Sequence, residues 1–192
     1  MAVKAPTGGA VKARFTSEEL QAIQAALGRS YELVKGELFE VAPPNVRHGR
    51  VTVRTARKLD TWAEEARAGQ VVAESGYTLE RNPDTVRGPD VSFIAKGRIS
   101  AEQARAGFPD LAPDLAIEVR SPNETWPELE EKAREYFAAG SRMVWFVEMD
   151  EFLEVLRPNV ERRRLGLDDT IEADDVLPGF RCKVREFFPE EV

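Results

Sequence analysis

Two carboxylates interrupt runs of apolar residues that have the composition of buried strands. Asp90 follows a proline and precedes Val-Ser-Phe-Ile, and Glu118 lies within Leu115-Ala-Ile-Glu-Val119. Burying an ionised carboxylate in a sheet costs roughly several kcal/mol unless a cation or strong donors compensate it. Oxygen ligands of this kind hold Mg²⁺ or Mn²⁺, which can bind a phosphate and lower the pKa of an attacking water. The two acids therefore predict a metal site suited to phosphoester hydrolysis.

A lysine on the following helix is the cation expected beside Glu118. Strand alternation puts Glu118 and Arg120 on one face, and the four-residue spacing of Glu128, Lys132 and Tyr136 gives these three a common helix face. Lys132 can then reach the end of the Glu118 strand and stabilise charge in the transition state. The structural alternative is that Glu118 simply pairs with Arg120 or Lys132, and Glu128 with Lys132.

The elements that must position these residues alternate between strands and helices. Expected strands cover residues 31–34, 37–41, 71–79, 91–95, 115–119, 143–147 and 152–156, and expected helices cover residues 16–28, 45–69, 100–106 and 127–139. This pattern predicts an α/β fold with one mixed central sheet flanked by helices, preceded by an N-terminal helix and β-hairpin. Residues 1–14 lack periodicity and are expected to form a flexible tail, with residues 15–192 forming a single domain.

Composition and charge exclude several classes of protein. The chain has 192 residues, 42% of them hydrophobic and 32% charged, which is typical of a soluble globular domain. No apolar run approaches the roughly 20 residues of a membrane helix, so no membrane association is expected. The single cysteine, Cys182, is expected to be buried in the last strand, and with no N-terminal apolar segment the sequence indicates a cytoplasmic protein.

Nucleic acid would have to bind a local basic face, because the formal net charge is −7. Arginines recur at three- and four-residue steps on the long helix, as Arg47, Arg50, Arg54 and Arg57, followed by Lys58. This stripe is the best candidate for phosphate-backbone contacts, and a solvated helix face is the equal alternative. The cluster at residues 162–164 is expected in a turn facing solvent. No Gly-rich phosphate loop, zinc spacing or serine-hydrolase elbow occurs.

The order of the motifs carries a family resemblance. Pro89-Asp90 followed by Glu118-Val-Arg120 resembles the PD-(D/E)-x-K superfamily of restriction-endonuclease-like nucleases, with Arg120 in the usual place of lysine. The supporting segments, in order, are Tyr31-Glu-Leu-Val-Lys-Gly-Glu-Leu, His48, Pro89-Asp90-Val, Glu118-Val-Arg-Ser-Pro122, Glu128-Leu-Glu-Glu-Lys132, Tyr136, Gly140, Trp145-Phe-Val and Leu177-Pro-Gly179-Phe. Over residues 16 to about 188 this order is similar to the Uma-two type family of bacterial endonucleases.

The resemblance implies a restriction-endonuclease-like fold and specific roles at the site. Asp90 and Glu118 would be metal ligands, and Lys132 would be the catalytic cation, displaced from the Glu118 strand to the next helix. Arg120 would assist, although an arginine can stabilise phosphate charge but cannot give up its proton near neutral pH. His48, the only histidine, becomes a catalytic candidate, the alternative being an exposed or hydrogen-bonded residue at a helix start.

Glu37 is a further candidate for the metal site, and Phe187-Phe188 is a candidate interface. Glu37, on the second hairpin strand, could complete the metal shell, or could be an ordinary edge-strand acid. The function implied is that of an endonuclease that uses Mg²⁺ or Mn²⁺ to hydrolyse nucleic acid, DNA being the expected substrate. The alternatives are a lapsed nuclease that binds nucleic acid or a protein, and a hydrolase of another phosphoester. Nucleases of this class often act as homodimers, and Phe187-Phe188 is expected to be exposed for such an interface.

Overall fold

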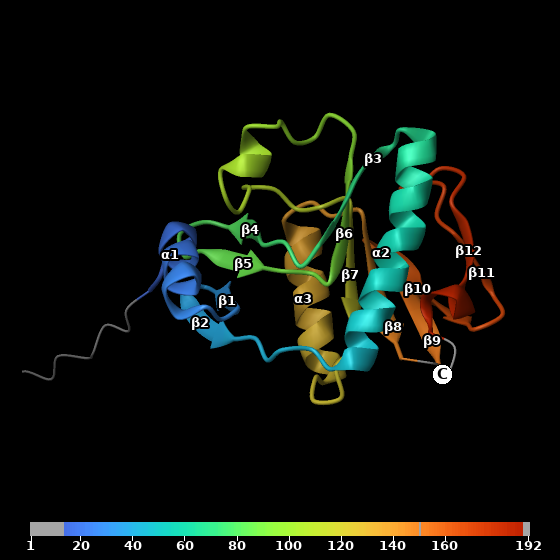
Figure 1. The fold of residues 1–192 in the computed structure, drawn as a ribbon, viewed down its shortest axis with the longest axis horizontal. Helices are drawn as coiled ribbons and strands as arrows, with labels where there is room; N and C mark the ends of the chain where they lie inside the picture. Colours follow the sequence, from blue (N-terminus) through green and yellow to red (C-terminus); the bar gives the residue numbers. More distant parts are fainter. Residues whose placement is uncertain (1–13, 150, 190–192) are drawn as a thin grey trace, which may run out of the picture.

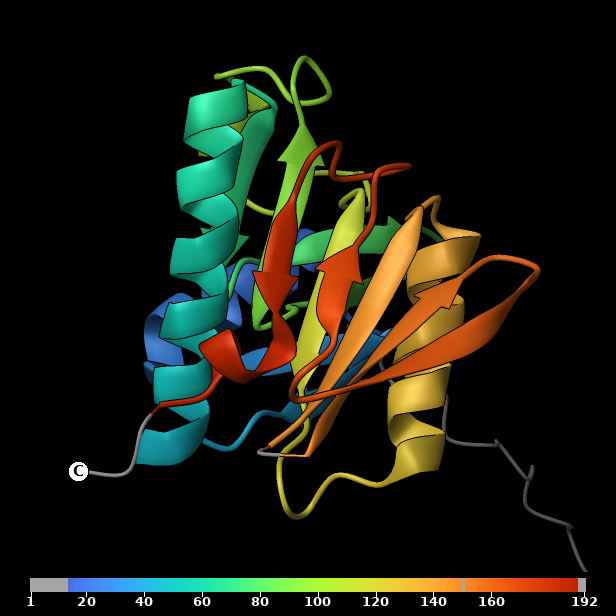
Figure 2. The ribbon, with the colours of Figure 1, turned by 90° about the vertical axis from the view of Figure 1, so that its right-hand side faces the viewer.

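A six-stranded mixed sheet forms the centre of the molecule (Figures 1 and 2). The computed structural model describes residues 14–149 and 151–189, so the expected tail lies outside this part of the chain except for Arg14. The sheet has the order β10-β9-β8-β7-β6-β3. Its strands are β3 (Gly69–Ala73), β6 (Val91–Ala95), β7 (Leu115–Val119), β8 (Met143–Glu148), β9 (Phe152–Arg157) and β10 (Val160–Gly166). Only β7 and β8 run parallel; the other neighbours in this sheet are antiparallel.

Two helices cover opposite faces of this sheet (Figure 2). On one face lie α2 (Val46–Ala66), the short ribbon of β11 (Thr170–Glu172) and β12 (Arg181–Lys183), and the 3₁₀ turn η2 (Val184–Phe187). On the other lies α3 (Trp126–Ala138), which forms the crossover between the parallel strands β7 and β8. Since neighbouring residues of a strand face opposite ways, Ile117 packs on the α2 side and Ala116 on the α3 side. Glu118 therefore also faces α3.

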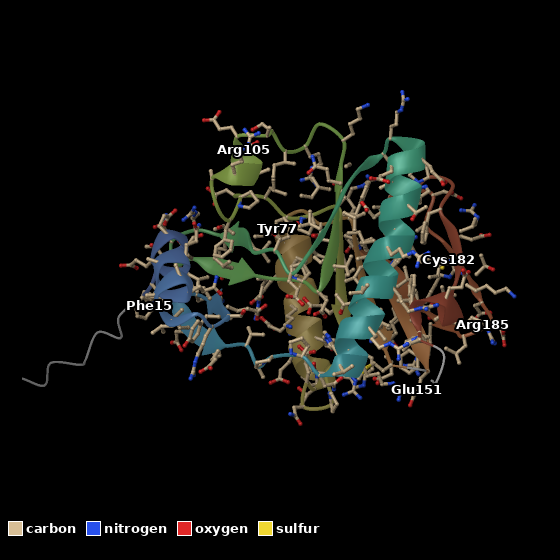
Figure 3. All side chains as sticks on the ribbon, viewed as in Figure 1. Phe15, Tyr77, Arg105, Glu151, Cys182 and Arg185 are labelled. Carbon is tan, nitrogen blue, oxygen red and sulfur yellow. The ribbon has the colours of Figure 1, made fainter. Side chains whose placement is uncertain are left out.

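A smaller sheet, of order β2-β1-β5-β4, lies beside the central one. It contains β1 (Tyr31–Val34), β2 (Glu37–Glu40), β4 (Tyr77–Glu80) and β5 (Thr85–Arg87), and α1 (Ser17–Leu27) packs on it. Tyr77 is buried between the two sheets, where its hydroxyl forms a 2.7 Å hydrogen bond with Ser92 of β6 (Figure 3). The N-terminal hairpin, β1 and β2, is therefore in the same sheet as β4, which contacts the central sheet through Tyr77.

Local signals explain where the helices begin and end. Helix α1 begins with a reciprocal capping box between Thr16 and Glu19 and ends at Gly28, whose φ is 63°. At the start of α3 the Glu128 carboxylate accepts hydrogen bonds from the Thr125 N–H and hydroxyl, both at 2.7 Å. This cap fixes the phase of α3 and thus the direction in which its side chains point.

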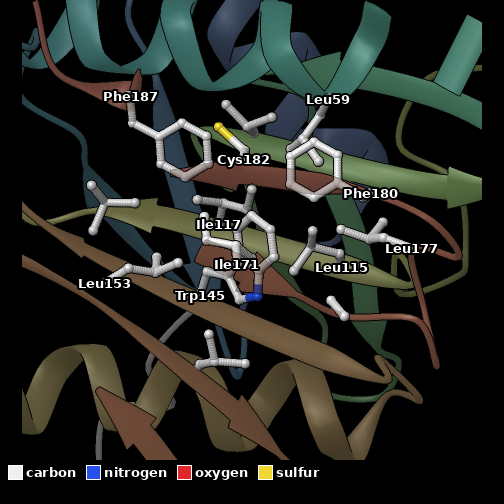
Figure 4. Packing of buried hydrophobic residues seen from close by; sticks show 14 of the residues in the cluster. Leu59, Leu115, Ile117, Trp145, Leu153, Ile171, Leu177, Phe180, Cys182 and Phe187 are labelled. Atoms are coloured by element: carbon white, nitrogen blue, oxygen red, sulfur yellow. The ribbon is translucent and has the colours of Figure 1, made fainter. Parts of the chain in front are cut away.

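The largest core lies between the central sheet and the α2 layer. Figure 4 shows Ile117 and Trp145 of the sheet packed with Phe180 and Phe187 from the C-terminal segment. Cys182 is buried in β12, as predicted. Phe187 and Phe188 are also buried, so the expectation that they form an exposed interface is wrong. Their segment instead returns to α2, where Lys58 pairs with the Glu186 carboxylate at 2.5 Å.

Four predictions of secondary structure are also corrected. Helix α2 ends at Ala66 rather than Gly69, because Arg67 adopts the left-handed cap conformation (φ 50°) and Gly69 begins β3. The strand expected at residues 71–79 is two strands, β3 and β4, in different sheets. The arginines at residues 162–164 lie in the edge strand β10 rather than in a turn. The short helix expected at 100–106 is a 3₁₀ turn, η1 (Gln103–Arg105). Among the described residues no helix is long and apolar enough to cross a membrane.

Candidate active site

Asp90 and Glu118 lie opposite each other on neighbouring antiparallel strands. Val91 pairs with Ile117. Asp90, the residue before β6, therefore lies opposite Glu118, the fourth residue of β7. The Asp90 Oδ2 atom accepts a 2.7 Å hydrogen bond from the Val119 N–H, which fixes the carboxylate at the end of β7. Asp114 makes the equivalent bond at the other end of the strand pair, where its Oδ2 accepts from Ala95 N–H at 2.7 Å.

His48 is buried beside Asp90, in the first turn of α2. Its backbone N–H donates to the Asn45 side chain, the helix cap, at 2.9 Å. Its Nε2 lies 2.8 Å from the Val119 carbonyl oxygen and 3.4 Å from Asp90 Oδ2. Burial alone would lower the pKa of His48, but the hydrogen bond and charge of Asp90 outweigh it and raise the pKa. The alternative of an exposed histidine does not hold, because the side chain is enclosed.

Glu118 is almost fully buried, with 3% of its surface exposed, and is held by two side chains of α3. The Tyr136 hydroxyl donates to Oε1 at 2.8 Å, and Lys132 Nζ lies 3.1 Å from Oε2. Burial, together with the charges of Asp90, Glu32 and Glu124, raises the pKa of Glu118 to about 7, although the charge of Lys132 opposes this rise. Of the helix face anticipated from spacing, Lys132 and Tyr136 reach Glu118, whereas Glu128 is used as the cap of α3.

Lys132 contacts a second carboxylate that the sequence analysis did not single out. Its Nζ lies 2.8 Å from Glu124 Oε1, in the loop between β7 and α3. Burial would lower the pKa of Lys132, but Glu118, Glu32 and Glu124 together raise it above its usual value. The ammonium therefore stays protonated near neutral pH, which suits charge stabilisation and excludes a role as general base.

Two further charged residues near the site were missed from sequence. Arg87, the last residue of β5, is buried with its Nη1 2.7 Å from Glu32 Oε2 and its Nε 2.5 Å from Glu135 Oε2. The other Glu32 oxygen accepts from Gly88 N–H at 3.2 Å. Arg87 thus joins the hairpin, the segment leading to Asp90, and helix α3. The sequence shows only an arginine at the end of the short strand Thr85-Val-Arg87, which by itself does not identify its partners.

Glu32 of the hairpin acts on the site through its charge. Its negative charge influences both Glu118 and Lys132. Glu37 lies on β2, paired with Val34 next to the turn. Because the small sheet has the order β2-β1-β5-β4, β1 is an inner strand and β2 an edge strand. Strand alternation and cross-strand pairing put both glutamates on one face of the hairpin, so the sequence pattern could not choose between them.

Arg120 lies just beyond β7 and is engaged away from the carboxylate pair. Its guanidinium pairs with Glu148, donates through Nη1 to the Glu124 carbonyl at 2.9 Å, and lies 5.5 Å from the Trp126 ring centroid. Among the described residues it forms no ion pair with Asp90 or Glu118. The strand ends at Val119, so the strand alternation that suggested a shared face with Glu118 stops before Arg120. Arg120 therefore holds the loop that carries Glu124.

The basic stripe lies on the outer face of α2. Arg47 and Arg50 are exposed, whereas Arg54 Nε donates to the Glu186 carbonyl at 3.1 Å. A hollow of about 460 Å³ is lined by Val46, Gly49, Arg50, Val53 and Arg54. The stripe begins next to His48 at the end of the helix that reaches Asp90. It is therefore continuous along the helix with the candidate site.

The donor set fits a hard divalent cation in its chemistry. Within residues 14–149 and 151–189, no three acidic, histidine or cysteine side chains are already gathered closely enough to hold a metal. Asp90 and Glu118 nevertheless offer carboxylate oxygens, the ligands that Mg²⁺ and Mn²⁺ prefer. Burial is the main cause of the raised pKa of Glu118, and the charges of Asp90, Glu32 and Glu124 add to it; a bound cation would favour the ionised carboxylate.

A family model named Uma2, described as "Putative restriction endonuclease", matches residues 17–185. The chain belongs to this family. The resemblance to Uma2 inferred from the motifs is therefore confirmed, and membership supports a nuclease. A comparison with curated proteins gives no match.

Solved structures agree on the fold. The crystal structure of "a putative nuclease belonging to DUF820" from Anabaena variabilis aligns with a TM-score of 0.73 and 20% identity, covering 84% of this chain and 90% of that one. This likeness confirms the mixed α/β nuclease fold. The cryoEM structure of a DrdV–DNA complex aligns with a TM-score of 0.43 and 14% identity over 91% of this chain and 94% of the other, which is too weak to support an argument.

Proposed function

We propose that this member of the Uma2 family is a divalent-metal-dependent endonuclease that hydrolyses phosphodiester bonds in DNA. The observation that carries the proposal is the meeting of Asp90 and Glu118 on adjacent strands with the Lys132 ammonium, 3.1 Å from Glu118. Two carboxylates that can hold a metal and a protonated amine that can stabilise phosphate charge are groups suited to metal-assisted phosphoryl transfer.

In this proposal each residue has a distinct task. Asp90 and Glu118 hold Mg²⁺ or Mn²⁺, which when bound activates water and polarises the phosphate. Lys132 stabilises negative charge on the phosphate oxygens. His48 keeps a proton on Nε2 between the Val119 carbonyl and Asp90, and so holds the Asp90 carboxylate in place. Glu32, whose charge acts on both Glu118 and Lys132, is assigned as a further acid near the cation.

The nucleic acid is proposed to bind along the α2 stripe. Arg47, Arg50 and Arg54 would neutralise backbone phosphates, and contacts of this kind position a duplex without reading its sequence. In a chain of formal charge −7, an arginine-rich helix leading to the site is the favourable route for a polyanion. Arg120 assists indirectly, by fixing the loop between β7 and α3.

The deciding experiment is cleavage of supercoiled plasmid at low salt with Mn²⁺, Mg²⁺ or EDTA. Wild type should nick the plasmid only with metal, and Glu118→Gln and Lys132→Ala should each abolish nicking. The matched control is Glu154→Gln, since Glu154 is also a buried glutamate, with Arg162 3.0 Å and Arg164 2.7 Å away on β10. Cleavage that persists in EDTA, or in both site variants, would refute the proposal.

A second candidate function is a nucleic-acid-binding module that has lost catalysis. It is favoured by one observation: Lys132 is neutralised by two carboxylates and, in the described part of the chain, no three-ligand cluster is ready for a metal. Such a protein would bind an oligonucleotide equally well with Mg²⁺ and with EDTA and would not cleave it. A loss of affinity on removal of metal would exclude this candidate.

A further inference from the structure

The shorter contact of the Lys132 ammonium is with a residue outside the proposed metal pair. Nζ lies 2.8 Å from Glu124 Oε1 and 3.1 Å from Glu118 Oε2. The side chains of Lys132 and Glu124 are only 16% and 19% exposed, so their contact is largely shielded from solvent. Two of the three N–H groups of the ammonium are thus directed at carboxylates before any phosphate arrives.

The loop that carries Glu124 is held by specific contacts. The Glu124 carbonyl accepts from Arg120 Nη1 at 2.9 Å, and its N–H donates to the Ser121 carbonyl at 3.0 Å. Arg120 in turn pairs with Glu148 and lies over the Trp126 ring. The backbone of Glu124 is therefore tied to the end of β8 and the start of α3, while its carboxylate contacts Lys132.

The charges around Lys132 oppose a phosphate. Arg87 is shared by Glu32 and Glu135 and brings no spare positive charge to the site, where Asp90, Glu118 and Glu124 accompany one ammonium. Three carboxylates and one ammonium carry a formal charge of −2, and one bound divalent cation brings it to zero. A phosphodiester would then meet no net attraction at the site, whereas without Glu124 it would meet a net positive charge.

We propose that the Glu124 carboxylate occupies the position on Lys132 that a phosphate oxygen of the nucleic acid takes during binding, so the substrate must displace Glu124. The inference rests on the proposed nuclease function. Glu124 acts through Lys132 and is a positioning residue: it holds the amine in place in the free protein and weakens the binding of any phosphate that cannot compete with it. Its removal should change substrate affinity and leave the chemical step intact.

The test compares Glu124→Gln with Glu128→Gln and Glu124→Asp. Glu128→Gln removes the same charge from the neighbouring helix turn, and a glutamine there can still cap α3. Glu124→Asp keeps the charge.

Cleavage of an oligonucleotide with Mn²⁺ gives KM and kcat, and fluorescence anisotropy with Ca²⁺ gives Kd for the same oligonucleotide. For Glu124→Gln, KM and Kd should fall about tenfold with kcat unchanged, as expected for loss of a like charge at a half-shielded site. Both control variants should stay near wild type.

The outcomes separate the two proposals. Unchanged KM and Kd in Glu124→Gln, with wild-type cleavage intact, would overturn this inference alone. A weaker Mn²⁺ affinity and a lower kcat in Glu124→Gln would also overturn it, because Glu124 would then be a metal ligand. If wild type binds the oligonucleotide but does not cleave it, comparing the Kd of wild type with the Kd of Glu124→Gln still decides the inference. If neither protein binds or cleaves the oligonucleotide, both proposals fail.

Discussion

Asp90 and Asp114 offer a matched pair of substitutions that separates metal binding from structural support. Each carboxylate accepts a 2.7 Å hydrogen bond from the backbone at opposite ends of the β6–β7 pair. An asparagine oxygen can accept the same bond, so Asp90→Asn should lower the free energy of unfolding of the metal-free protein by no more than about 1 kcal/mol. Asp114 also pairs with Arg98 at 3.0 Å, so Asp114→Asn should cost about 1 to 3 kcal/mol.

The metal response should show the opposite order. A divalent ion at a concentration 100-fold above its Kd stabilises the folded state by about 2.7 kcal/mol. For a chain of 192 residues this corresponds to a rise in Tm of about 5 to 10 °C. Loss of a ligand charge in Asp90→Asn should weaken binding about 100-fold, leaving about 0.4 kcal/mol, or about 1 °C, at the same concentration. Asp114→Asn should keep the full rise from a lower starting Tm.

Thermal unfolding with EDTA and with Mn²⁺, together with calorimetric titration of Mn²⁺, measures both quantities on the same samples. Circular dichroism of each metal-free variant controls for loss of fold. A full metal-induced rise in Asp90→Asn would refute Asp90 as a ligand. A lost rise in Asp114→Asn would show that the metal response follows general stability rather than this site.

Three further predictions concern other parts of the site. Arg87→Met should lower the free energy of unfolding by about 3 kcal/mol in urea, since it leaves Glu32 and Glu135 buried without their cation; a loss below about 1 kcal/mol would contradict this. The pKa of Glu118 is about 7 in the folded protein, above the ordinary 4.5, so protonated Glu118 stabilises the folded state. This contribution to the free energy of unfolding is complete below pH 4.5 and is lost as the pH rises through 7. Mn²⁺ needs the ionised form, so its calorimetric affinity should fall as pH drops below 7, with a proton released on binding; a pH-independent affinity would contradict this. Arg50→Ala should reduce the slope of log affinity for DNA against log salt by about 1, and an unchanged slope would remove Arg50 from the interface.

The part of the site that sequence could predict depends on local rules. Glu118 faces α3 because strand residues alternate, and Lys132 and Tyr136 face Glu118 because they are one helical turn apart on a helix whose phase is set by its cap. The capping residues and the alternation are both visible in the printed sequence. These two rules sufficed to bring an acid and an amine together across a strand–helix crossover.

The part that could not be predicted depends on contacts between distant segments. The position of Glu32 beside the site depends on β1 pairing with β5, some 50 residues later, where Leu33 lies opposite Val86. Burial of Phe187 depends on the C-terminal segment returning to α2. The pairing of Arg120 with Glu148 follows from the end of β7 at Val119, of which strand alternation gives no sign. Each of these features therefore involves a pairing partner or a strand end that single-sequence patterns do not encode.

Two buried glutamates on the same face of the central sheet show why Glu118 differs from a structural acid. Glu118 is opposite Phe146, and Phe146 is opposite Glu154, so the two acids lie two strands apart in the same orientation. Glu154 pairs with Arg162 and Arg164, and Arg162 also pairs with Glu130, so arginines and carboxylates are equal in number there. Glu118 shares one lysine with Glu124 and has Asp90 nearby, so carboxylates outnumber cations around it. Cations balance carboxylates around Glu154 but are outnumbered by them around Glu118, and this local deficit of positive charge supports the proposed cation site at Glu118.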